Sequence, residues 1–233
     1  MMSFQKDATV VFVHGAWGDG SSWGTVINSI SEAGLKVVCA PIPMTTLSDD
    51  IAAVQRVIER IDGPVLLVGH AYAGAVIAGA EDSKVKGLVY ITALAPDEGE
   101  TVAEVFYRHT PHSEAPQLAP DKNGYIWIPH EAFSKAFAQH AKADELVRLE
   151  AVQRPIHVSC IQEKSPAPAW KKKATWFLIA QEDRMIVEKT QRFMAERMNA
   201  TIRSAPADHT PSLTLPKAVV DIVLEAAQAT LTN

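Results

Sequence analysis

Short strand-like runs alternate along the chain with segments whose apolar residues recur at helical spacing. The runs are Thr9–Val13, Lys36–Ala40, Val65–Val68, Val85–Thr92, Thr175–Ala180 and Ala200–Ala205. The first and third are continuously apolar, which is typical of strands buried on both faces of a parallel sheet. Strands that alternate with helices form βαβ units with right-handed crossovers. The order therefore predicts an α/β fold, a mostly parallel sheet with helices on both faces.

Helices are expected between these strands. Polar residues that can accept a hydrogen bond from a first turn stand at the start of two of them, Ser21 or Ser22 and Ser48 or Asp49. The remaining helices are expected at Ala73–Ala80, Glu188–Met198 and Pro216–Gln228. Proline is tolerated in the first turn of a helix, so Pro216 can stand at the start of the last helix.

Residues from about 96 to 171 interrupt the alternation. This stretch is rich in histidine, proline and aromatic residues, among them Tyr107 and Trp127. We expect a small, mostly helical lid that lies over the end of the sheet. A length of 233 residues suits one large domain. The lid is therefore expected to be an insertion within a single domain that covers residues 1–233.

Composition and charge argue against several classes of function. A formal charge of −5 provides no basic surface for nucleic acid or for an anionic membrane. No apolar stretch is long enough to span a bilayer, and the first apolar run is too short for a signal peptide, so a cytoplasmic location is expected. Cys39 and Cys160 lack metal-type spacing and are expected to be reduced thiols. The lid histidines show no HExxH spacing, so no metal is expected.

Four candidate functional segments each come directly after an expected strand. His14-Gly15-Ala16-Trp17 follows the first strand, and Gly69-His70-Ala71-Tyr72-Ala73-Gly74 follows the third. Asp183 and His209 follow the last two strands. Each of these segments is therefore expected on a loop that follows a strand. Small residues on both sides of Ala71 allow a tight turn from strand to helix that exposes this residue at its apex.

This order of segments resembles the α/β-hydrolase family, in which nucleophile, acid and histidine follow successive strands. The VFVHGAW opening and the QEDRMI and ADHTPS endings are similar to the small-esterase branch, which includes plant methylesterases and hydroxynitrile lyases. The resemblance implies an acid at Asp183, with Glu182 or Asp97 as alternatives, and a base at His209. It implies oxyanion-binding amides at Ala16 and Tyr72, and no cofactor. Substrate-contacting side chains are expected at Trp17, His70, Tyr107 and Trp127.

The chain departs from the family pattern at the nucleophile. The motif Gly-x-Ser-x-Gly appears as Gly69-His70-Ala71-Tyr72-Ala73. A methyl group cannot attack a carbonyl, so no acyl-enzyme can form at Ala71. Two explanations stay open: a serine is natural and was substituted to hold a substrate uncleaved, or the alanine is natural.

The leading hypothesis is cofactor-independent hydrolysis of an ester or similar acyl compound of a small, apolar molecule. If the alanine is natural, the His209–Asp183 pair can serve a lyase or another proton-transfer reaction. A third hypothesis is a non-catalytic protein that binds a small molecule. All three give the chain a small-molecule ligand and no nucleic-acid or membrane partner.

Overall fold

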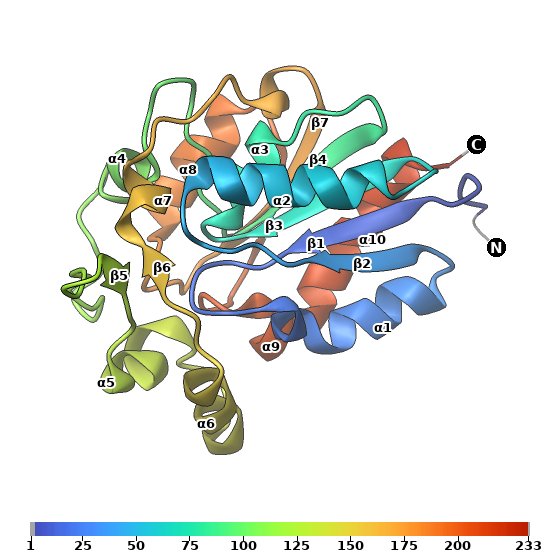
Figure 1. The fold of residues 1–233 in the computed structure, drawn as a ribbon. Coiled ribbons are helices and arrows are strands. Elements are labelled where there is room, and N and C mark those ends of the chain that lie inside the picture. Colours follow the sequence, from blue (N-terminus) through green and yellow to red (C-terminus); the bar gives the residue numbers. More distant parts are fainter. Residues whose placement is uncertain (1–2, 233) are drawn as a thin grey trace.

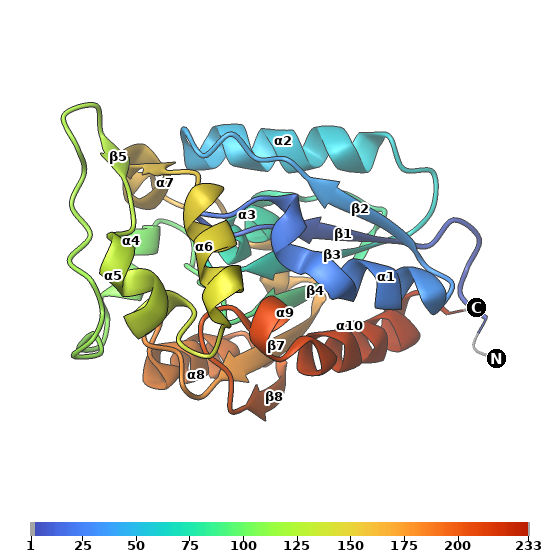
Figure 2. The ribbon, with the colours of Figure 1, turned by 90° about the horizontal axis from the view of Figure 1, so that it is seen from below.

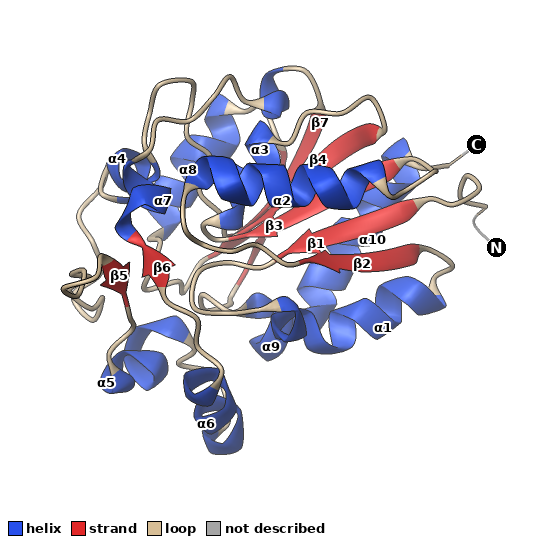
Figure 3. Cartoon of the chain, in the orientation of Figure 1, coloured by secondary structure: helices blue, strands red, loops and turns tan. Residues whose placement is uncertain are grey.

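A single parallel sheet forms the centre of the molecule. The structure is a computed structural model that describes residues 3–232. Six strands lie in the order β2-β1-β3-β4-β7-β8, and every neighbouring pair is parallel (Figures 1 and 3). They are β1 (Thr9–Val13), β2 (Lys36–Ala40), β3 (Val65–His70), β4 (Val85–Ile91), β7 (Ala174–Ala180) and β8 (Thr201–Ala205). The predicted α/β fold with its mostly parallel sheet is confirmed.

Helices cover both faces of this sheet (Figure 2). On one face lie α1 (Gly24–Glu32) and α10 (Pro216–Thr230), and on the other lie α2 (Leu47–Glu59), α3 (Ala73–Gly79) and α8 (Glu188–Arg197). The side chains of β1 point alternately to the helices on one face and to those on the other, because successive side chains of a strand point to opposite faces of the sheet. Val10 and Phe12 join the layer of α1 and α10, whereas Val11 and Val13 join the other layer.

The capping residues at the start of two helices differ from those that the sequence predicts. Asp19, not Ser21 or Ser22, caps a 3₁₀ turn that leads into α1, and its carboxylate accepts a hydrogen bond from the Ser21 amide at 2.8 Å. Thr46, not Ser48 or Asp49, caps α2. A capping residue needs extended backbone, and the chain is extended at both positions, with φ of −144° at Asp19 and −143° at Thr46.

The lid region between β4 and β7 consists of short elements beyond one end of the sheet (Figure 1). It contains α4 (Val102–Phe106), β5 (Tyr125–Ile126), α5 (His130–Ala132), a π-helical turn (Phe133–Phe137), α6 (Ala143–Ala151), β6 (Ile156–His157), α7 (Val158–Gln162) and a 3₁₀ turn (Ala169–Lys171). The antiparallel pair β5–β6 was not predicted, because two residues a strand show no periodicity. The short helix α9 (Pro211–Thr214), just after His209, was also not predicted.

No helix within residues 3–232 is both long enough and apolar enough to cross a bilayer. In the same part of the chain, no three potential ligand side chains gather closely enough to hold a metal ion.

Candidate functional site

A two-residue turn connects the third strand to the helix behind it. β3 ends at His70 and α3 begins at Ala73, so Ala71 and Tyr72 form the turn. Ala71 has a φ of 50°, in the left-handed region that residues with a side chain rarely adopt. The Leu94 amide holds this conformation by donating to the Ala71 carbonyl at 2.9 Å. The turn therefore presents the side chain of Ala71 at its apex.

Small residues beside the turn are required by close backbone approaches. A Cβ added at Gly69 would lie 2.8 Å from the carbonyl oxygen of Ala73. A Cβ added at Gly15, on the loop after β1, would lie 3.0 Å from the Cβ of Ala71. The first loop thus packs directly on the turn, which explains why glycine stands at both positions.

The structure brings Asp183 and His209 into contact. Their loops follow β7 and β8, and Oδ2 of Asp183 lies 2.8 Å from Nδ1 of His209. Both residues are buried, with exposures of 3% and 2%. The Asp183 carboxylate also accepts hydrogen bonds from the Met185 amide (2.7 Å), the Ile186 amide (2.9 Å), the Gln191 side chain (3.1 Å) and the Thr92 hydroxyl. Because a carboxylate only accepts, Nδ1 carries the hydrogen of this bond, and in the neutral imidazole Nε2 presents its lone pair.

The two alternative acids lie elsewhere. Glu182 is half-exposed and pairs with His140 at 3.0 Å. Asp97 pairs with Lys171 at the surface. Neither makes a hydrogen bond to His209 within residues 3–232.

An apolar cavity of about 70 Å³ adjoins these residues. Ala71, Tyr72 and His209 line it at the sheet, together with Ala16 and Trp17. The rest of the wall is apolar or aromatic and consists of Leu94, Val102, Ala103, Phe106, Tyr107, Leu118, Ile126, Ile156, Ile161, Met185 and Ile186. No Lys, Arg, Asp or Glu is among these residues. The cavity therefore suits an uncharged, apolar molecule.

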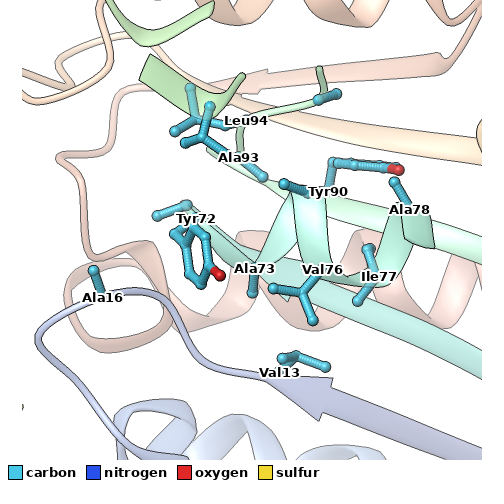
Figure 4. Packing of buried hydrophobic residues seen from close by; sticks show 14 of the residues in the cluster. Val13, Ala16, Tyr72, Ala73, Val76, Ile77, Ala78, Tyr90, Ala93 and Leu94 are labelled. Carbon is cyan, nitrogen blue, oxygen red and sulfur yellow. The ribbon is translucent and has the colours of Figure 1, made fainter. Parts of the chain in front are cut away.

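Two backbone amides at the cavity, those of Ala16 and Tyr72, have no hydrogen-bond acceptor within residues 3–232. Figure 4 shows Ala16 on the loop that follows Val13, and Tyr72 just before Ala73. Nε2 of His209 likewise has no hydrogen-bond partner in this part of the chain. One acceptor and two donors are thus free at one cavity.

Of the four side chains expected to contact substrate, the structure places two in the cavity wall. Trp17 is buried there, and its indole N–H donates to the carbonyl of Ile126 at 2.9 Å. Tyr107 lines the cavity and is 53% exposed, so it lies where the cavity meets solvent. Trp127 is 48% exposed and is not part of the wall. Its neighbour Ile126 lines the wall, and successive residues of extended chain face opposite sides.

His70 is also outside the cavity wall, because its ring lies behind His209. The Nε2–H group of His70 donates to the carbonyl of His209 at 2.6 Å. Burial, with a smaller contribution from the neighbouring His209, lowers the pKa of His70 to about 3. His70 therefore stays neutral and holds the His209 loop from behind.

The sequence analysis missed a buried carboxylate that supports Tyr72. Asp50 on α2 is fully buried, and its Oδ2 accepts a hydrogen bond from the Tyr72 hydroxyl at 2.6 Å. Its Oδ1 accepts from the Met44 amide at 2.7 Å, and the Cys160 thiol of α7 lies 3.8 Å from Oδ2. Burial raises the pKa of Asp50. A signal was present, because Asp50 lies four residues before the buried Val54 and so shares its helix face.

The lid is fastened to the loops that carry Asp183 and His209. The His140 amide donates to Oδ2 of Asp208 at 2.9 Å, next to His209. The Gln139 side chain donates to the carbonyl of Glu182 at 2.7 Å, next to Asp183. This part of the lid is therefore tied to the residues that precede Asp183 and His209.

Comparison with known proteins agrees with this geometry. The model of the alpha/beta hydrolase family matches residues 10–222. A carbendazim hydrolyzing esterase from Nocardioides sp. (strain SG-4G) is 30% identical over 126 residues, which are 48% of this chain and 52% of that protein. The match thus spans about half the length of that curated relative.

Solved structures of similar shape include esterases and other hydrolases. A pyrethroid hydrolase from Sphingobium faniae JZ-2 has a TM-score of 0.83 and 20% identity, covering 95% of this chain and 98% of that one. Polyneuridine aldehyde esterase has a TM-score of 0.82 and 17% identity, covering 94% and 99%. At these identities the likeness shows the fold alone. The family match over residues 10–222 is more specific, and it shows that the chain belongs to the alpha/beta hydrolase family.

Proposed function

We propose that the cavity is an ester-hydrolysis site for a small, apolar ester or similar acyl compound, and that Ala71 stands at the position of the nucleophile. The observation that carries this proposal is the buried Asp183–His209 pair, joined at 2.8 Å, at an apolar cavity. The names of the esterase and hydrolase relatives agree with acyl chemistry.

The proposed roles follow from the free polar groups at the cavity. Nε2 of His209 acts as the base, and Asp183 holds the ring in the tautomer that leaves Nε2 unprotonated. The amides of Ala16 and Tyr72 stabilise the negative charge that develops on the carbonyl oxygen. Both donors belong to the backbone, so neither depends on the side chain at position 71.

The apolar wall indicates the class of substrate. A charged acyl or alcohol group would lose its hydration in the cavity without meeting an ion partner, which costs free energy. An uncharged ester loses little hydration and gains burial of apolar surface. We therefore infer a neutral substrate, with Trp17, Tyr107 and the lid side chains shaping its pocket.

Ala71 prevents the serine route in this chain, since its methyl group cannot form an acyl-enzyme. In other enzymes, removal of a catalytic side chain leaves an acceleration on the order of 10³–10⁴ over water, from the oxyanion hole and binding. We therefore expect weak ester hydrolysis from the chain as it stands and much faster hydrolysis once a hydroxyl is restored.

The test compares the unmodified chain with its Ala71→Ser variant on a panel of short-chain aryl esters. We expect strong turnover by the serine variant, and loss of that turnover when His209→Ala is added. A folded serine variant that stays inert on the whole panel would contradict an ester-hydrolysis site. Circular dichroism and thermal melting of each variant establish that it is folded.

The alanine at position 71 favours a second candidate, a site that does not cleave an ester bond. Such a site holds a small apolar molecule intact, or it only moves a proton, as in a lyase. Equilibrium dialysis followed by mass spectrometry of the bound ligand tests it. Recovery of intact ester after prolonged incubation supports retention, whereas recovery of the acid and alcohol contradicts it.

A further inference from the structure

We infer that this chain hydrolyses its ester with a water molecule that His209 activates directly, in the space beside the Ala71 methyl group, without a covalent intermediate. The inference rests on the proposed function. It differs from the serine route in the attacking atom, in the number of chemical steps, and in the variants that abolish it.

The first step of the argument is space. Ala71 and His209 line the same cavity, and a methyl group at position 71 makes no hydrogen bond to the imidazole. One water requires on the order of 10–15 Å³. The cavity of about 70 Å³ is several times larger than that minimum.

The second step is polarity. A buried water needs two to four polar partners, and most of this cavity wall supplies none. Within residues 3–232, the free polar groups beside Ala71 are Nε2 of His209, an acceptor, and the amides of Ala16 and Tyr72, which are donors. Water is therefore favoured at the base and at the two amides, and is disfavoured elsewhere in the cavity.

The third step is the fixed state of the base. Nδ1 of His209 donates to Asp183, which holds the ring, and the His209 carbonyl accepts from His70, which holds the backbone of the same residue. The Asp183 carboxylate is in turn held by donors from three further segments: the Met185 and Ile186 amides, the Gln191 side chain and the Thr92 hydroxyl. The ring therefore needs no contact with residue 71 to keep its orientation, and the base survives without a serine.

The reaction balances with water as the sole co-reactant. The water oxygen bonds to the carbonyl carbon as one of its protons passes to Nε2 of His209, and the carbonyl electron pair moves onto the oxygen held by the amides of Ala16 and Tyr72. That pair then re-forms the carbonyl and the bond to the leaving oxygen breaks. The leaving oxygen takes the proton from Nε2. The products are one acid and one alcohol, nothing is oxidised or reduced, and His209 returns to its starting state.

The experiment uses the unmodified full-length chain with two acetate esters, 4-nitrophenyl acetate and phenyl acetate. We expect hydrolysis that His209→Gln lowers by about 10²-fold, the lower range of general-base catalysis. We expect no burst, no acetyl adduct in the intact-protein mass, and rates that differ between the two leaving groups. The His130→Gln variant is the matched control, since it makes the same substitution at an exposed histidine that pairs with Glu150 and is not part of the cavity wall. It should retain the activity.

The Ala71→Ser variant is expected to behave differently in each assay. It should show a burst and an acetyl adduct, and a serine-reactive phosphonate should inactivate it. The same reagent should leave the unmodified chain active, which also excludes a contaminating serine esterase as the source of its turnover.

The outcomes separate the inference from the proposed function. The inference is wrong if the unmodified chain hydrolyses the esters no faster than its His209→Gln variant. If the serine variant is nevertheless active and depends on His209, the proposed function stands. An acetyl adduct on the unmodified chain, or its inactivation by the phosphonate, also overturns the inference. Inertness of every folded variant removes the proposed function and the inference together.

Discussion

The hydroxyl of Tyr72 donates a 2.6 Å hydrogen bond to the fully buried carboxylate of Asp50. This contact joins the residue after the Ala71 apex to helix α2, and the Cys160 thiol brings the lid helix α7 to the same carboxylate. The side chain of Tyr72 lines the cavity, and its amide is one of the two free donors there. Asp50 therefore acts as a support for the site from outside the cavity.

We expect Tyr72→Phe to lower the free energy of unfolding by about 1–3 kcal/mol, because it leaves a buried carboxylate oxygen without its strongest donor. Urea denaturation measures the change. Tyr107→Phe is the matched control, since the Tyr107 hydroxyl makes no hydrogen bond within residues 3–232 and its side chain is half-exposed. A double-mutant cycle with Asp50→Asn should show a coupling of about 0.5–3 kcal/mol. Strictly additive losses would contradict a direct contribution of this bond.

The Asp50 carboxyl should also make stability depend on pH. Burial raises its pKa above the usual value of 3.8, so the folded chain keeps a proton that the unfolded chain releases. This group's contribution to stability is complete below pH 3.8 and is lost as pH rises through the raised pKa. Unfolding free energies measured from pH 3.5 upward should therefore fall less steeply in Asp50→Asn than in the unmodified chain. Identical slopes would contradict the prediction.

His70 should have the opposite effect. Its pKa is about 3 in the folded chain against 6.5 for an ordinary histidine, so the unfolded chain binds the proton first. Its contribution is complete above pH 6.5 and is lost as pH falls toward about 3, by at most about 1.4 kcal/mol for each pH unit. We expect His70→Gln, whose amide can still donate to the His209 carbonyl, to reduce this acid sensitivity. The more exposed His130→Gln is the control and should leave the slope unchanged.

Asp183 should be the residue that orients the base. In the Ala71→Ser background we expect Asp183→Asn to lower kcat by about 10⁴-fold, because an amide can stabilise the wrong tautomer of His209. Glu182→Gln and Asp97→Asn are the matched controls and should leave kcat unchanged, since these carboxylates pair with His140 and Lys171. A larger loss from either control than from Asp183→Asn would reassign the acid.

The exposed lid residues Tyr107 and Trp127 should differ in their effect on substrate binding. Tyr107 lines the cavity and Trp127 does not, although their exposures of 53% and 48% are similar. In the Ala71→Ser background we expect Tyr107→Ala to raise KM about tenfold, through loss of apolar contact worth about 1.4 kcal/mol. Trp127→Ala should leave KM unchanged. Equal effects of the two substitutions on KM would contradict a substrate contact made by Tyr107 and not by Trp127.

The sequence by itself determined the chain order of the six sheet strands and of the main helices between them, and the loops that meet at the carboxyl edge of the sheet. Continuous apolar runs such as Thr9–Val13 can be read locally, and parallel pairing then forces the loops after them to one edge. Ala71, Asp183 and His209 could for this reason be expected on loops at that edge, whereas the roles predicted for them came from the family resemblance. The need for glycine beside Ala71 was also readable, because a tight turn leaves no room for a Cβ.

Only the tertiary structure decided which side chains surround that edge. Asp50 and Tyr72 are 22 residues apart in the sequence, and Asp50 and Cys160 are 110 residues apart. No local sequence pattern therefore indicates that these residues are in contact. The same holds for the lid, where Tyr107 faces the cavity and Trp127 faces away. Local periodicity reports which positions are apolar, whereas the direction of each side chain depends on how short elements pack over the sheet, and that packing is set by contacts between distant segments.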